Sequence, residues 1–388
     1  MRHGYPERVT STPPAPDDAA QRPATTPVDG VPAAAGASAS APWPLRRLHL
    51  WFPLLLAVIL LCSVASLMVG GRTNTLGQAW ERIPDALAYA GDPQRLPASR
   101  SGDELVVVMG LLRLPRTVLA LLVGAALGAA GTVIQGHTRN PLTDPGILGI
   151  NAGAAAAVVL SLMFGWTHSP TGYVWPALIG CALVTAAVFA LSSTGSTAAN
   201  PLSIVLAGAA LSAILMAVVN ALVLSDDDAL EGLRQWATGS VAGRDLDVAW
   251  VVLPIILVGL VLACAQGSAL NLLALGETVA RSLGLSTTRW RVLGLLSVAL
   301  LGGAATAAAG PVAFVGLAAP HIVRAVVGPD YRLVVPYAAL LGAALALAVD
   351  VLGRIIARPG ELQMGIVMAL VGVPFFVILI RRGKVQAL

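Results

Sequence analysis

The sequence predicts an all-α, polytopic membrane protein of about ten transmembrane helices, arranged in two halves of inverted topology. Hydrophobic residues make up 56% of the 388 residues, whereas Asp, Glu, Lys and Arg together make up only 11%. Soluble domains carry about 25% charged residues. Uncharged stretches of spanning length also recur along most of the chain. A soluble fold is therefore excluded, and the lipid bilayer is the expected environment.

The first 45 residues have a different composition, rich in Pro, Ala, Ser and Thr and without apolar periodicity. Such a segment buries too little apolar surface to fold, so residues 1–45 are predicted to be a disordered cytoplasmic tail. A secretory signal is disfavoured because the stretch before the first apolar run is too long and lacks a clean basic start. Residues 46–388 are predicted to form the transmembrane domain.

A transmembrane helix needs about 20 mostly apolar residues. The uncharged windows are 50–70, 117–136, 146–166, 173–192, 202–224, 248–266, 292–309, 311–323, 333–349 and 362–380. The count of ten holds only if Gly310-Pro311 divides the long run into a full helix and a shorter one that ends at Arg324. One long kinked helix is the alternative, and it would reverse the direction of every later span.

Charge sets the orientation, because cytoplasmic loops carry an excess of arginine and lysine. With the N-terminus inside, the inner segments hold Arg46, Arg47, Arg139, Arg281, Arg289, Arg291, Arg324, Arg332, Arg381, Arg382 and Lys384. Most acidic residues then fall in two outer loops, within 81–104 and 226–247. Ten spans also place the basic C-terminus inside, whereas nine would not.

Two stretches repeat the same order of features. Residues 117–149 and 292–317 each run as an apolar helix, a glycine and a Pro/Gly break. In the ten-span topology they cross the membrane in opposite directions, and inverted repeats place a transport path at their interface. The match is weak by itself, since Ala/Gly-rich helices resemble one another by composition.

The second span has unusual ends. Arg113 and Arg116 stand at its outer mouth, where they either snorkel to lipid headgroups or bind acidic groups of a partner. At its inner end, Asn140-Pro-Leu-Thr-Asp-Pro145 supplies prolines that stop the helix and side chains that can bond the freed backbone groups. We treat this turn as architectural, with a secondary role in lining a path.

Residues 270–284 form an apolar stretch at helical spacing between the sixth and seventh spans. Glu277 and Arg281 are four residues apart, which predicts an ion pair on a short surface helix. Gly276 and Gly284 are expected to interrupt or end this helix. The helix either lies on the lipid interface or fits a cleft of a partner subunit.

Further motifs follow in the C-terminal half: Gly310-Pro-Val-Ala-Phe-Val-Gly316, Pro320-His-Ile-Val-Arg324, Asp350 and Arg354. Together with the motifs of the second span, they resemble the FecCD-type permease family of ABC importers for iron-siderophores, haem and vitamin B12. The resemblance covers roughly residues 50–384. It implies a membrane-spanning permease subunit of the bacterial plasma membrane, with both termini cytoplasmic. Its implied partners are ABC ATPase subunits, an extracellular or periplasmic substrate-binding protein, and a second permease copy or a paralogue.

The resemblance also implies roles for single residues. Docking of the binding protein falls to Arg113, Arg116 and Arg354. ATPase coupling falls to the coupling segment, residues 268–286, and within it to Leu275, Gly276, Glu277, Ala280, Arg281 and Gly284. We assign the translocation path and gate to Gln135, Asn140, Pro141, Asn200, Pro201 and Gly208. The family usually has Ala in place of Thr143 and a proline after Glu361-Leu362, so this chain departs at both points.

Other chemistry has little support. No Gly-x-x-x-x-Gly-Lys-Ser/Thr motif occurs, and the only lysine is Lys384, so ATP hydrolysis must come from a partner. No catalytic constellation or metal-ligand spacing stands out, and His321 is given no ligand role, so no enzyme activity, cofactor, metal or nucleic acid is expected.

Asp350 and Arg354 are expected to pair on one helix face. An ion-coupled secondary transporter is the rival from another class, but it should show charged groups at mid-membrane. The external Trp236…Gly239-Ser240 stretch is expected to form a loop helix. Siderophore is the preferred cargo only because it is the commonest in the family.

Overall fold

The computed structural model describes residues 45–70, 76–91, 103–167, 169, 171–192 and 201–381, and these are helical with no strand. Seven helices are long and apolar enough to cross a bilayer, by length and composition, and three shorter apolar helices accompany them. The long helices are α1 (Leu45–Met68), α4 (Leu114–Thr138), α6 (Val174–Ser192), α7 (Pro201–Val223), α9 (Leu246–Ala265), α12 (Thr287–Ala309) and α14 (Tyr331–Ile356). The shorter ones are α5 (Ile150–Met163), α13 (Val315–Val327) and α15 (Met364–Arg381). Each of the ten predicted windows therefore contains a helix, although α5, α13 and α15 are shorter than their windows or displaced from them.

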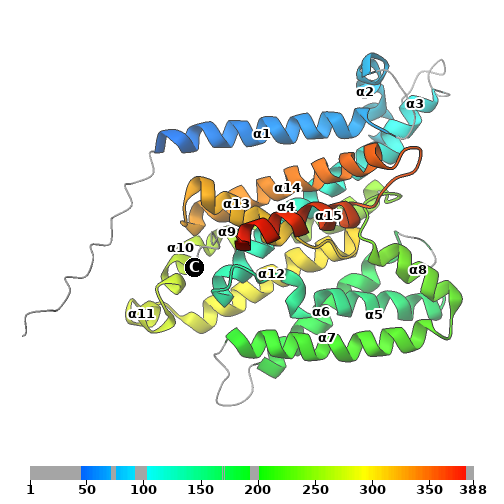
Figure 1. Ribbon diagram of the computed structural model, residues 1–388. Coiled ribbons are helices and arrows are strands. Elements are labelled where there is room, and N and C mark those ends of the chain that lie inside the picture. Colours follow the sequence, from blue (N-terminus) through cyan, green and yellow to red (C-terminus); the bar gives the residue numbers. More distant parts are fainter. Residues whose placement is uncertain are drawn as a thin grey trace, which may run out of the picture. The chain divides into compact units, whose positions relative to one another are not determined.

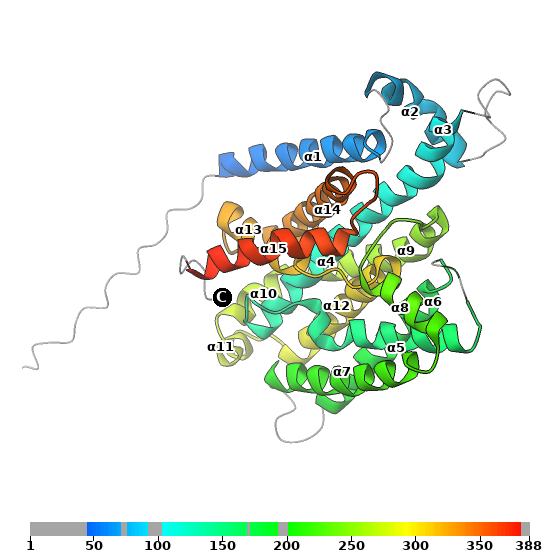
Figure 2. The ribbon, with the colours of Figure 1, turned by 45° about the vertical axis from the view of Figure 1, so that its right-hand side comes forward.

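The remaining helices lie at the two ends of the bundle. Figure 1 places α10 (Gly267–Ala274) and α11 (Glu277–Ser282) at one end, which we call the α10–α11 end. The opposite end, the α2–α3 end, holds α2 (Leu76–Gly91), α3 (Glu104–Val107) and α8 (Asp227–Ala237), and Figure 2 shows the same separation. The predicted loop helix around Trp236 is confirmed as α8.

The second span is longer than the sequence predicts. It starts at Glu104, continues through a π-helical turn η2 (Val108–Arg113), and runs without interruption into α4. The predicted start at residue 117 is wrong because Arg113 and Arg116 find partners inside the protein, so these charges do not end the helix. Both arginines lie within one continuous helix.

The long uncharged run divides as predicted. α12 ends at Ala309, and two residues with positive φ, Gly310 (75°) and Phe314 (68°), bend the chain back before α13 begins. The carbonyl of Ala309 accepts a hydrogen bond from Ser240 N at 2.7 Å, in the loop after α8. Arg324, near the other end of α13, contacts α4 close to its C-terminus. The chain therefore reverses direction here, and a single kinked helix is excluded.

α4 lies at the centre of the bundle and packs against α14, α12, α13 and α9. It runs antiparallel to α14 with almost no space between the backbones. A Cβ atom placed on Gly128 would lie 2.0 Å from the carbonyl oxygen of Ala338, and one on Gly131 would lie 1.9 Å from that of Gly316. Small residues permit such approach in lipid, where apolar side chains gain nothing by leaving the acyl chains. Close backbone packing is thus one of the contacts that hold α4, α13 and α14 together.

The two breaks that the proposed repeat pairs with each other also meet in space. After α4, the chain passes through a 3-10 turn, η3 (Pro145–Leu148), before α5. A Cβ on Gly316 would lie 3.0 Å from Pro145, and Thr306 Oγ1 lies 3.1 Å from Asn151 Oδ1. The interrupted segments of both halves therefore form one region, as expected where a path follows an inverted repeat.

Candidate functional site

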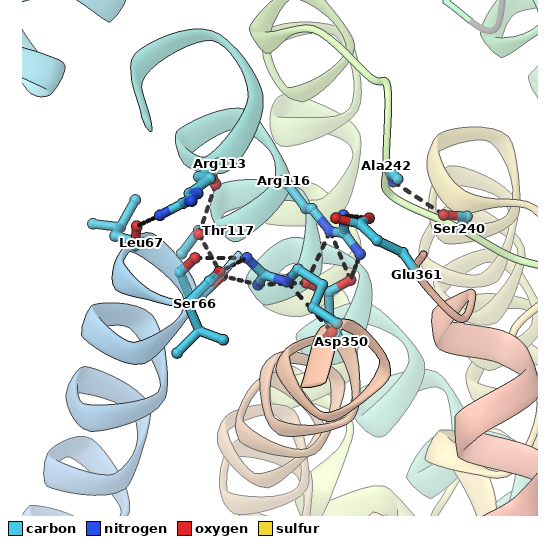
Figure 3. A network of polar contacts seen from close by, with 11 residues as sticks. Ser66, Leu67, Arg113, Arg116, Thr117, Ser240, Ala242, Asp350 and Glu361 are labelled. Carbon is cyan, nitrogen blue, oxygen red and sulfur yellow. Dashed lines mark hydrogen bonds and ion pairs between the residues drawn. The ribbon is translucent and has the colours of Figure 1, made fainter. Parts of the chain in front are cut away.

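A cluster of buried charges joins α4, α14 and the loop before α15 at the α2–α3 end (Figure 3). Arg116 Nε donates to both carboxylate oxygens of Asp350, at 2.9 and 3.0 Å. Arg354, one turn further along α14, donates from Nη2 to Asp350 Oδ2 at 2.8 Å, which confirms the predicted pair. Arg116 also pairs with Glu361. Asp350 has no solvent exposure, so two guanidinium groups compensate a fully buried carboxylate. We call Arg113, Arg116, Asp350, Arg354 and Glu361 the arginine cluster.

Two of these arginines also close the end of α1. Arg113 Nη1 donates to the carbonyl oxygens of Leu67 and Met68, at 2.9 and 3.1 Å. Arg354 Nη1 donates to those of Ser66 and Val69, at 2.7 and 2.8 Å. The last carbonyls of a helix lack partners within it, and cations are favoured there. The arginines thus supply from α4 and α14 the donors that α1 cannot provide itself.

The sequence predicts Arg113, Arg116 and Arg354 at the outer surface, but the structure buries them, with exposures of 6%, 6% and 1%. The reason is that each has carboxylate or helix-end partners inside the chain. They still line a recess of about 920 Å³ at the α2–α3 end, together with Arg82, Asp103, Glu361 and other residues. Their role in docking therefore stays a prediction, and it now concerns a recess and not a flat surface.

At one edge of this recess, Arg82 of α2 donates from Nε to Asp103 Oδ2 at 2.7 Å. This hydrogen bond lowers the pKa of the Asp103 carboxyl from its usual value. Asp103 also accepts from Leu105 N and so caps the N-terminus of α3. The recess is thus walled by fixed charges of both signs.

The coupling segment lies at the opposite end as two short helices, whereas the sequence predicts one. Gly276 separates α10 from α11 with φ of 112°, a conformation that other residues rarely adopt. Gly284 ends the segment with φ of 85°. No described atom lies within 4 Å of a Cβ placed on Gly276, so the chain leaves open space beside this residue.

The predicted ion pair in the coupling segment is confirmed. Glu277 Oε1 lies 2.6 Å from Arg281 Nη2 and 3.5 Å from Arg291 Nη2 of α12. Ala280 is fully buried and so packs α11 onto the bundle, whereas Leu275 is 63% exposed. The exposed face of the segment also carries apolar side chains, at Val279 and Leu283. An open glycine beside exposed apolar groups is suited to contact with a partner protein.

The residues assigned to the path are dispersed. Gln135 has no exposure: its Nε2 donates to the carbonyl of Gly316 at 3.1 Å and its Oε1 accepts from Arg324. A Cβ on Gly208 would lie 2.1 Å from Ile147 O. Gln135 and Gly208 therefore fill helix contacts and line no open surface of this chain, because each joins two segments.

The remaining path residues lie elsewhere. Asn140 is exposed, and its Oδ1 accepts from Leu142 N at 2.9 Å, as the architectural interpretation of the proline turn predicts. Pro141 is half-buried. Asn200 lies outside the described residues, as does the predicted tail except for Leu45, and the side chain of Pro201 is not described. The path assignment thus stays a prediction.

Sequence reasoning missed the contacts between the coupling segment and α14. Asn271 and Asp330 form a hydrogen bond of 2.6 Å, although 59 positions separate them. Asp330 precedes an apolar run and could have been identified as a helix N-cap. Nothing in the sequence signals its partner.

Comparisons with known proteins agree with one another. The FecCD transport family matches residues 55–382. The ferric enterobactin transport system permease protein FepD of Escherichia coli is 38% identical over 85% of this chain and 94% of its own. The vitamin B12 import system permease protein BtuC of Serratia proteamaculans is 38% identical over 76% and 88%. A solved structure of a transporter assigned to the metal-chelate ABC type, in an inward-facing conformation, matches with a TM-score of 0.72 at 27% identity and covers 88% of this chain and 100% of its own.

Proposed function

This chain belongs to the FecCD transport family, and on that premise we propose that it is the permease subunit of an ABC importer that moves iron–siderophore complexes into the cytoplasm. One observation carries the proposal beyond the family. The helix bundle has an arginine-lined recess at its α2–α3 end and an open, partly apolar coupling segment at its α10–α11 end. A protein with this arrangement can respond at both ends to different partners.

We place the coupling segment in the cytoplasm, where ATPase subunits dock on it. The chain has no P-loop motif of its own, so the energy for transport comes from these partners. The recess lies outside, where a substrate-binding protein presents acidic groups to it. Arg113 lines this recess and its described hydrogen bonds use Nη1 alone, so its guanidinium group is a candidate donor to such groups.

The topology supports a cytoplasmic location for both termini, in a bacterial plasma membrane. The C-terminal ends of α1 and α14 meet in the arginine cluster, so these helices run in the same direction, as ten spans require. We propose that two copies, or this chain and a paralogue, frame the path. α7 keeps large apolar side chains exposed, among them Leu206 (60%) and Ile214 (61%), and is the candidate to face that path.

Haem and cobalamin are the alternative cargoes, since members of the family carry them. An ion-coupled secondary transporter is the alternative from another class. It needs a carboxylate that is free to bind and release its ion, whereas Asp350 is held between Arg116 and Arg354. This arrangement favours a structural carboxylate and disfavours ion coupling.

Reconstitution in proteoliposomes tests the proposal. The chain is co-expressed with a candidate ATPase and binding protein, and uptake of iron–siderophore, haem and cobalamin is measured with ATP inside. We expect ATP-dependent accumulation that needs the binding protein and is greatest for an iron–siderophore. Uptake driven by an ion gradient without ATP would reject the ABC assignment, and a preference for haem or cobalamin would change the cargo alone.

A further inference from the structure

The side chain of Asn271, on α10, caps the N-terminus of α14. Its Nδ2 donates to Asp330 Oδ1 at 2.6 Å, and its Oδ1 accepts from Tyr331 N, the first amide of α14, at 2.9 Å. Asp330 Oδ1 also accepts from Arg332 N at 2.9 Å. The first amides of a helix have no partner within it. One amide side chain therefore uses both its donor and its acceptor to fix α10 against the start of α14.

Two further contacts hold the same pair of elements together. Arg332 Nε donates to Ser268 Oγ at 3.1 Å. A Cβ placed on Gly267 would lie 2.8 Å from Arg332 Cα, so the backbones of α10 and α14 nearly touch. α10 thus lies directly on the first turn of α14 and cannot shift without breaking specific bonds.

The other half of the coupling segment is attached to a different helix. Glu277 of α11 pairs with Arg291 of α12 at 3.5 Å, and Arg281 Nε donates to Thr287 Oγ1 at 3.2 Å. A displacement of the coupling segment can therefore be transmitted to the bundle by two described routes, through α12 or through α14. The route through α14 includes both hydrogen bonds of the neutral Asn271 side chain, beside the contacts of Ser268 and Gly267 with Arg332.

α14 connects the two ends of the bundle. It has 26 residues and is about 39 Å long. Its last two turns carry Asp350 and Arg354 of the arginine cluster. Along its length it packs closely on α4, where a Cβ on Gly124 would lie 2.3 Å from Gly342 O. A long helix confined in this way moves as a rigid element.

We propose that Asn271 is a positioning residue that transmits displacement of the coupling segment to α14, and through α14 to the arginine-lined recess. The inference rests on the proposed function, in which the ATPase contacts α10–α11. Without the amide, Tyr331 N loses its acceptor and Asp330 loses one donor. The contacts of Ser268 and Gly267 with Arg332 remain, so the ATPase then moves α14 less for the same displacement of the segment.

Three forms of the reconstituted importer test this role: the unaltered chain, Asn271→Leu, and the exchange of Asn271→Asp with Asp330→Asn. Leucine keeps the side-chain volume but forms no hydrogen bond. The exchange keeps one amide and one carboxylate across the same contact, so both bonds of residue 271 can form again: the carboxylate now at position 271 accepts from the amide now at position 330 and from Tyr331 N. The bond from Arg332 N to residue 330 is not restored, because Asp330 Oδ1 accepts from both Asn271 and Arg332 in the unaltered chain. Measured are ATPase co-purification, ATP hydrolysis with and without loaded binding protein, and cargo taken up per ATP hydrolysed.

We expect uptake per ATP hydrolysed to fall about tenfold in Asn271→Leu when it is compared with the unaltered chain at equal amounts of bound ATPase, as the loss of a bond to a charged group predicts. Stimulation by the binding protein falls in parallel, and the exchange restores both. Normal coupling in Asn271→Leu overturns the proposal, and so does a failure of the exchange to restore it. If Asn271→Leu cannot be purified, the single variant Asn271→Asp, which opposes two carboxylates, is compared with the exchange. Failure of the unaltered chain to bind an ATPase would instead overturn the proposed function.

Discussion

At Asp350, one fully buried carboxylate holds Arg116 and Arg354 in place, and through Arg354 the end of α1. Removing one partner of such a group leaves charges without compensation in a region that excludes water, and this is far more costly than losing an exposed pair. The arginine cluster is therefore a structural centre of the protein, whatever it binds.

Asp350→Asn tests this stabilising role. The substitution should lower the free energy of unfolding by about 3 kcal/mol, because two guanidinium groups lose their shared counterion. Thermal unfolding of the detergent-purified protein measures it. Arg234→Gln is a suitable control, because its pair with Glu231 is exposed and 4.0 Å long, and it should cost less than about 0.5 kcal/mol. Equal losses for the two variants would contradict the structural role.

Docking can be separated from stability at Arg113. Arg113→Gln removes the charge from the recess and, because glutamine is shorter than arginine, also weakens the bonds to Leu67 O and Met68 O, so the variants are compared at equal amounts of folded protein. We expect affinity for the binding protein to fall about tenfold, since a charge-assisted contact is lost, with ATPase binding unchanged. Arg234→Gln again serves as the control, because it removes an arginine from the same end of the bundle without altering the recess. Unchanged affinity in Arg113→Gln would reject the docking role.

At the scale of elements, the coupling segment is divided by a glycine that needs its positive φ and has open space around it. A side chain at Gly276 has two separable effects: backbone strain and bulk on the outer surface. The surface bulk matters only if a partner covers this place.

Gly276→Trp should abolish co-purification of the ATPase, whereas Gly276→Ala should weaken it only mildly, because alanine adds strain without bulk. Gly243→Trp is the matched control: Gly243 also has a positive φ and open space, but it borders the recess at the other end. Glu277→Arg should have the smaller effect expected for a partly exposed pair, about 1 kcal/mol or less. If Gly276→Trp retains the ATPase, the segment is not the coupling element.

The elements differ in how far the sequence predicts them. The seven long apolar helices and the three shorter ones are predictable because apolar runs are a local property, and the division at Gly310-Pro311 is marked by the residues themselves. The start of the second span is not, because the partner that lets Arg116 stay inside the helix is Asp350, 234 positions away. The same limit applies to the candidate site. The sequence indicates the types of residue in the site and the ion pairs between residues four positions apart. Burial of the arginines and the contact of Asn271 depend on distant segments, so the sequence does not indicate them.

At the scale of the whole molecule, the predicted tail is the part that the proposed mechanism does not use. The arginine-lined recess and the coupling segment both lie in residues that the structure describes, and the family match begins only at residue 55.

Deleting residues 1–45 should therefore preserve expression and uptake. The deletion is compared with the full chain by membrane content and by ATP-driven uptake at equal protein. A large loss of transport at normal expression would assign the tail a function.

The bonds at the end of α1 also bear on the order of biosynthesis. A ribosome completes α1 first, yet the guanidinium group that satisfies Ser66 O and Val69 O belongs to Arg354, 288 positions after Ser66. Until α14 has entered the bilayer, these carbonyls depend on water or on lipid headgroups. The first helix to be made is thus among the last to acquire its final neighbours. A nascent chain that stops before α14 therefore carries an α1 whose last carbonyls still lack their guanidinium donor.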